Sequence, residues 1–155
     1  MDQVQNNVFT QVYLGIVLPD TQKLTRPFDR KTAVVSLTKT LTDSVAFVER
    51  YGKKGWALTC EALLKLLINP PVPPAADDII PDQDVDDSAF GVGFTQLNTC
   101  KKPPLDPYPE IADVKSWVGA YLKEADARHG QRISGFIQER LSPEARSTLV
   151  TYMQS

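Results

Sequence analysis

The 155-residue sequence has little of what catalytic, metal-binding and disulfide-rich proteins require. It contains two cysteines, Cys60 and Cys100, and one histidine, His129. Two cysteines without a CxxC pair provide neither a disulfide framework nor a zinc site. Because no acid, base and nucleophile can be assembled from conspicuous motifs, the sequence predicts a protein that is not an enzyme and carries no cofactor.

An excess of positive charge and long apolar runs are also missing. The 17 lysines and arginines are balanced by 19 aspartates and glutamates, for a formal net charge of −2. This charge predicts no nucleic acid or anionic membrane partner and favours basic partners instead. The longest early apolar run, residues 12–18, is far shorter than the roughly 20 residues of a membrane helix, and the N-terminus lacks the basic start of a signal peptide. We therefore expect a soluble intracellular protein.

What the sequence does contain is a helical hydrophobic period. A first helix is predicted from an apolar stripe that Pro19 ends or kinks: Phe9, Val12, Tyr13, Ile16 and Val17. Asp29 is expected to cap a second helix with one apolar face: Ala33, Val34, Leu37 and Leu41. The two would form a helical hairpin. The second helix leaves three cations, Arg30, Lys31 and Lys39, for solvent or a partner.

The rest of the chain continues this pattern. A third helix runs from Trp56 to Ile68 and stops at Pro70, and residues 90–97 suggest a short one before an extended, proline-rich segment over 103–109. The last third predicts three more helices: one from an Asp113 cap to a stop at residues 129–130, one over 133–141, and one opened by the Ser-Pro-Glu at 142–144. About seven helices and no credible strand predict an all-α fold.

Three short patterns that resemble catalytic or binding motifs have simpler explanations. Ser36 and Lys39 have SxxK spacing, but no KTG triplet accompanies them. The glycines at 91 and 93 lack the third glycine and the strand of a dinucleotide loop. His129 lies where a helix is predicted to end, and a cation there interacts favourably with the helix dipole.

The stretch from residue 70 to 89 is rich in proline and aspartate. Asp82, Asp84 and Asp86 alternate as in a calcium loop, but Asp87 occupies the position of the turn glycine and a glycine the position of the final carboxylate. We expect no metal site there. Apolar residues at 79–80 and at 90 and 94 would be costly to leave in water, which predicts a loop held at both ends. Its charge either meets a basic surface or is simply solvated.

Several segments together resemble the C-terminal end of the CAS-type exportins. "DDIIPDQD" is followed by "FGVGFTQL", "KKPPLDP" and "LSPEARSTLVTYMQ", and the earlier "LPDTQKL" and "DRKTAVVSLTKTL" fit the preceding part. The resemblance covers nearly the whole chain and rests on the order and spacing of these segments. It implies a HEAT-type α-α superhelix (solenoid), of which residues 1–155 are a C-terminal fragment.

The resemblance also implies a function. Members return importin-α to the cytoplasm in complex with Ran-GTP and shuttle between nucleus and cytoplasm; the Ran site lies mainly in N-terminal repeats that this chain lacks. Residues 1–155 are expected to contribute to cargo binding and to cap the solenoid, and an isolated fragment is expected to self-associate. Partner contacts are assigned to seven residues: Asp82, Asp84, Asp86, Asp87, Arg30, Lys31 and Lys39. The alternatives are a helical adaptor unrelated to transport or a small enzyme.

Overall fold

The computed structural model describes residues 8–52, 54–71 and 105–154. Within these residues the helices are α1 (Val8–Val12), the π-helix η1 (Tyr13–Val17), α2 (Leu18–Thr21), α3 (Pro27–Thr42), α4 (Val45–Arg50), α5 (Lys54–Ile68), α6 (Val114–Arg128), α7 (Arg132–Arg140) and α8 (Pro143–Gln154). Because α1, η1 and α2 follow one another without a break, the described residues form seven helical segments and no strand. The all-α prediction is confirmed.

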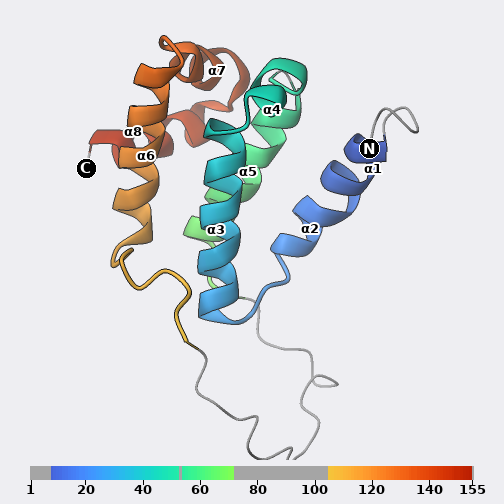
Figure 1. The fold of residues 1–155 in the computed structure, drawn as a ribbon, viewed down its shortest axis with the longest axis vertical. Coiled ribbons are helices and arrows are strands. Elements are labelled where there is room, and N and C mark those ends of the chain that lie inside the picture. Colours follow the sequence, from blue (N-terminus) through green and yellow to red (C-terminus); the bar gives the residue numbers. More distant parts are fainter. Residues whose placement is uncertain (1–7, 53, 72–104, 155) are drawn as a thin grey trace, which may run out of the picture.

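Helix α3 lies at the centre of the molecule (Figure 1). It packs against α5 on one side and α6 on the other, while α7 and α8 pack on α5 and α6. In Figure 1, α3 and α5 run in opposite directions, and the α1–α2 run lies on the far side of α5 from α6. Successive helices that each bury a face against a neighbour are consistent with the predicted HEAT-type solenoid fragment.

The core joins α3, α5, α6, α7 and α8. Its largest fully buried side chains are Trp56, Leu41, Leu63, Leu122, Ile133 and Leu149. The Trp56 indole donates a hydrogen bond to the main-chain oxygen of Leu41 at 3.2 Å, and its ring meets Phe136 edge to face with centroids 5.5 Å apart. Trp56 therefore links α5 to α3 and α7 while its one polar group remains satisfied.

The first helical run differs from its predicted form. Of the predicted stripe, Val12, Ile16 and Val17 are 42%, 56% and 41% exposed. Phe9 and Tyr13 of the stripe pack inward as predicted, but the face they share with the core also contains Leu18. The spacing explains the error: the π-helix adds a residue to one turn, so residues 13 and 18, five apart, share a face. Helical backbone also continues past Pro19 to Thr21.

The predicted hairpin of the first two helices is also wrong in its packing. The inward face of this run packs chiefly on α5 and α4 instead of on α3: η1 and α2 contact α5, and the Gln22 side chain donates to the Ala62 oxygen at 3.1 Å. Phe9 and Tyr13 lie against the rings of Phe47 and Tyr51 in or beside α4.

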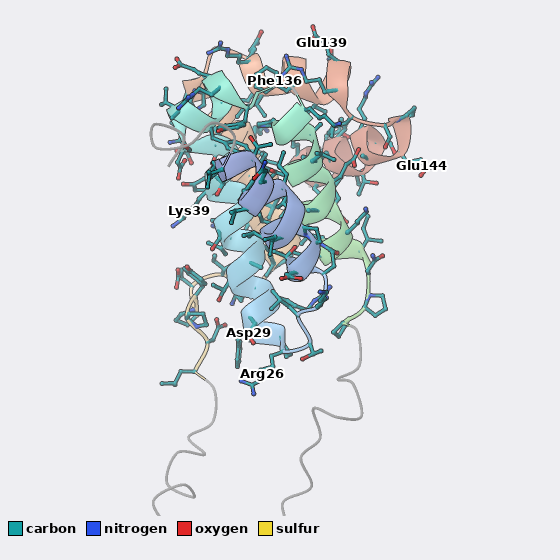
Figure 2. All side chains as sticks on the ribbon, turned by 90° about the vertical axis from the view of Figure 1, so that its right-hand side faces the viewer. Arg26, Asp29, Lys39, Phe136, Glu139 and Glu144 are labelled. Atoms are coloured by element: carbon teal, nitrogen blue, oxygen red, sulfur yellow. The ribbon has the colours of Figure 1, made fainter. Side chains whose placement is uncertain are left out.

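Several helix ends follow their local sequence. The Asp113 carboxylate accepts from the main-chain N–H groups of residues 115 and 116, and the Ser142 hydroxyl accepts from that of residue 145. Helix α6 ends before Gly130, which has a φ of +60°. The Asp29 cap is wrong: α3 begins at Pro27, and Asp29 lies in its first turn (Figure 2). The short helix expected over 90–97 lies outside the described residues.

Candidate partner-binding site

The first turns of α3 carry two neighbouring cations that bind within the chain. The Arg30 guanidinium donates through Nη2 to the main-chain oxygens of Leu66 and Asn69, both at 2.7 Å, and through Nη1 to that of Leu24 at 3.3 Å. The last carbonyls of a helix have no intrahelical partner, and Pro70 cannot extend α5 to provide one. Arg30 therefore stabilises the end of α5 with charge and hydrogen bonds.

Lys31 holds a different segment. Its Nζ donates to the Asp106 carboxylate at 2.5 Å and to the main-chain oxygen of Tyr108 at 2.7 Å. The Lys31 side chain is only 13% exposed. Asp106 also accepts from the Tyr108 N–H at 2.9 Å, which closes a turn. The hydrogen bond from Lys31, followed by that from the Tyr108 N–H, lowers the pKa of Asp106, so its carboxylate stays charged in mildly acidic solution.

Together the two cations hold the chain on both sides of residues 72–104. Arg30 holds the chain just before this stretch and Lys31 holds it just after, on adjacent residues of α3. These contacts are polar and lie in the flanking residues, and the attachment that the sequence predicts through apolar side chains stays a prediction. The apolar residues at 79–80, 90 and 94 lie outside the described part of the chain.

The opposite end of α3 is joined to α6. Asp43 accepts from the Tyr121 hydroxyl at 2.8 Å and from Arg128 Nη2 at 3.2 Å. His129 Nε2 lies 2.6 Å from the main-chain oxygen of Thr42. This carbonyl is at the end of α3, where the helix itself supplies no hydrogen-bond partner. Desolvation by itself would raise the pKa of Asp43, but the hydrogen bonds from Tyr121, Thr42 and Arg128 together lower it. Both ends of α3 are therefore held by charged groups.

The structure describes three of the seven predicted site residues. Arg30 and Lys31, expected to be left for solvent or a partner, instead donate to groups of the same chain; that either also contacts a partner stays a prediction. Lys39 is exposed and points away from the helices (Figure 2). The four aspartates, Asp82, Asp84, Asp86 and Asp87, and most of the predicted acidic loop at 70–89 lie outside the described residues.

Sequence reasoning did not find the Asp43, Tyr121 and Arg128 contacts. These residues are separated by up to 85 positions, so no local spacing indicates their proximity. The same holds for Lys31 and Asp106, which are 75 positions apart.

The described residues contain no cluster of His, Cys, Asp and Glu that could hold a metal ion. Cys60 is fully buried, and desolvation, with a smaller contribution from Glu61, raises the pKa of its thiol. A neutral, inaccessible thiol is a poor nucleophile. In the part of the chain that the structure covers, no helix is both long and apolar enough to cross a bilayer.

Comparison with known proteins identifies the family. Residues 1–152 match the family described as "CAS/CSE protein, C-terminus". The "Importin-alpha re-exporter" of Schizosaccharomyces pombe is 28% identical over 98% of this chain, and "Exportin-2" of Xenopus laevis and of Homo sapiens are 29% and 26% identical over 99% of it. The chain spans 16% of the length of each of these relatives, and no solved structure matches it. The chain therefore belongs to the CAS/CSE family, as the resemblance predicted, and corresponds to the C-terminal part of its members.

Proposed function

We propose that the chain acts as the C-terminal part of a nuclear export receptor that recycles importin-α to the cytoplasm in complex with Ran-GTP. The observation that carries this proposal is the match over nearly the whole chain to relatives named for importin-α re-export and export. Such a receptor shuttles between nucleus and cytoplasm, and its role is transport and not catalysis. Contacts with Ran-GTP would come mainly from more N-terminal repeats.

The acidic stretch is the part of the chain that we assign to cargo binding. Asp82, Asp84, Asp86 and Asp87 would face a basic surface of importin-α, because six acids and no lysine or arginine occur between residues 70 and 100. Arg30 and Lys31 would act as positioning residues, since they hold the chain on both sides of this stretch. Lys39, exposed on α3, is a candidate for a separate contact.

The two ends of the fold support a capping role. The last helix, α8, buries only Leu149 fully, and its outward positions include Ser147 and Thr151, with Val150 as its one exposed large apolar residue. The first run instead exposes Val12, Ile16 and Val17. A terminal repeat of a solenoid needs a polar outer surface, whereas an inner face is covered by the next repeat. We assign α8 to the outer end of the array.

A binding measurement with a matched charge control tests the cargo assignment. Importin-α, with and without Ran-GTP, would be titrated against the 155-residue protein and against a variant with Asn at positions 82, 84, 86 and 87. We expect the variant to bind about tenfold more weakly and to show a shallower dependence of affinity on salt, because screened charge pairs are lost.

The control removes four other exposed carboxylates and leaves the acidic stretch intact. Asp20→Asn with Glu49→Gln, Glu139→Gln and Glu144→Gln changes the net charge equally; two of these positions are labelled on the surface in Figure 2. This variant should bind within twofold of the parent. Equal weakening of both variants would show a general effect of net charge, and an unchanged affinity and salt slope in the first would show that the aspartates are merely solvated.

A further inference from the structure

An open groove lies between α6, α7 and α8, the three helices at the C-terminal end of the chain in Figure 1. Its volume is about 500 Å³, within the range of roughly 300–1,000 Å³ seen for ligand sites. Helix α7 contributes positions spaced by three and four, and α8 contributes positions spaced by four, three and one, so one face of each helix lines the groove. The lining residues are Lys123, Ser134, Ile137, Gln138, Arg146, Val150, Met153 and Gln154.

Three of the lining residues, Ile137, Val150 and Met153, are apolar. Ile137 is 3% exposed and belongs to the core, whereas Val150 remains 40% exposed. Met153 is half-buried beside it and packs against the same core. Methionine adapts its shape to different neighbours, which suits a surface that accepts side chains from a partner. The groove lining therefore offers partly uncovered apolar area beside a core residue.

Two of the lining residues carry positive charge. Lys123 of α6 and Arg146 of α8 line the groove, and no carboxylate is among its lining residues. Lys123 is exposed and forms no ion pair with another described residue. The Asp126 carboxylate accepts from the main-chain N–H of Ser134 at 2.8 Å and from the hydroxyl of Ser134. It is therefore hydrogen-bonded to the first turn of α7.

Arg146 is held in place independently of any ligand. Its Nη2 donates to the main-chain oxygens of Gln138 and Leu141 at the end of α7. Its Nη1 forms no hydrogen bond with the described residues. A cation fixed in this way loses little conformational entropy on binding an anion. The groove thus combines apolar side chains with one exposed and one preorganised cation.

We infer that this groove is a docking site for an acidic peptide segment of a partner protein, in which apolar residues alternate with aspartate or glutamate. Apolar side chains of the segment lie against Val150 and Met153, and its carboxylates pair with Lys123 and Arg146. The charge of the lining residues selects this occupant over a basic peptide. An open surface also suits a peptide better than a small molecule, which would bury little of its area there.

Fluorescence anisotropy tests the inference with a defined probe. A fluorescein-labelled decapeptide of alternating glutamate and leucine would be titrated with the 155-residue protein at about 0.15 M salt, where distant surface charges are screened beyond roughly 8 Å. We expect saturable binding, and none by the same peptide with lysine in place of glutamate. Lys123→Glu should weaken binding about fivefold or more, and Val150→Asp should do the same.

Arg132→Glu is the matched control. It reverses one charge at the exposed first position of α7, outside the groove, where an acid suits the helix dipole. This variant should bind within twofold of the parent. Circular dichroism and amide hydrogen exchange of α8 would establish that each variant is folded; a groove variant whose α8 protection falls is replaced by Gln138→Glu, for which the same weakening is expected.

Three results would overturn the inference. The first is an absence of saturable binding up to about 1 mM, an affinity of only about 4 kcal/mol. The second is equal weakening by Lys123→Glu and Arg132→Glu, which would indicate net charge alone. The third is binding at least fivefold tighter after the change of Asp82, Asp84, Asp86 and Asp87 to Asn, which would show that the chain's own acidic stretch fills the groove.

Discussion

Replacing Gly119 with alanine should separate α8 from α6. A Cβ atom on Gly119 would lie 1.8 Å from the main-chain oxygen of Tyr152 and 2.4 Å from its carbonyl carbon. Backbone atoms of a helix cannot rotate away as a side chain can. The C-terminal part of α8 must therefore move outward by about 1.5 Å before the contact becomes ordinary.

The size of the effect follows from two opposing terms. Overpacking of this kind costs about 1–3 kcal/mol and occasionally more, and outward movement of α8 also loosens the packing of Leu149, which is fully buried. Alanine in a helix interior returns up to about 1 kcal/mol of helix propensity. We expect a net loss of about 1–2 kcal/mol in the free energy of unfolding, or about 2–8 °C in Tm for a chain of this size.

Gly135→Ala is the matched control. Gly135 also lies inside a helix, α7, but apart from its chain neighbours and the backbone of its own helix no atom comes within 4 Å of the position of its Cβ. The same change there should gain the helix propensity alone and raise the free energy of unfolding by about 0.5–1 kcal/mol.

Thermal unfolding followed by circular dichroism, together with amide hydrogen exchange of α8, measures both variants. Gly119→Ala should lose protection in α8, while Gly135→Ala should not. A Gly119→Ala protein as stable as the parent, with α8 fully protected, would refute the close approach of the two helices and with it the shape of the groove.

Two further changes test the base of the acidic stretch and the first helical run. The pKa of Asp106 is lowered in the folded protein, so its contribution to stability is present above its unfolded pKa of about 4 and is lost as the pH falls through the folded value. In Lys31→Gln, an NMR titration of the Asp106 carboxyl should show the midpoint return toward about 4; a midpoint equal to that of the parent would contradict the pairing. Val12, Ile16 and Val17 form an exposed apolar surface, for which we predict self-association. Ile16→Glu should abolish the rise of mass with concentration in light scattering, and a strictly monomeric parent protein at several hundred micromolar, a concentration at which even weak association of about 5 kcal/mol is visible, would show the prediction to be wrong.

The sequence by itself determined the features that depend on neighbouring residues. The caps at Asp113 and Ser142, the stop at Gly130 and the apolar face of α5 are set by side chains within a few positions, and each is present in the structure. The family resemblance likewise rests on the order of short segments. Local signals were insufficient for α4: Val45–Arg50 spans only six residues, too few for a hydrophobic period to stand out.

Only the tertiary structure decided which faces are covered and which charges are paired. The π turn at Tyr13–Val17 shifts the buried face of the first run, and its stability depends on packing against α4 and α5. Arg30, Lys31 and Asp43 resemble ordinary surface charges in the sequence, yet they bind groups 36 to 85 positions away. Such contacts form because packing of α3 between α5 and α6 brings distant carbonyls and carboxylates within reach, and no local propensity encodes that distance.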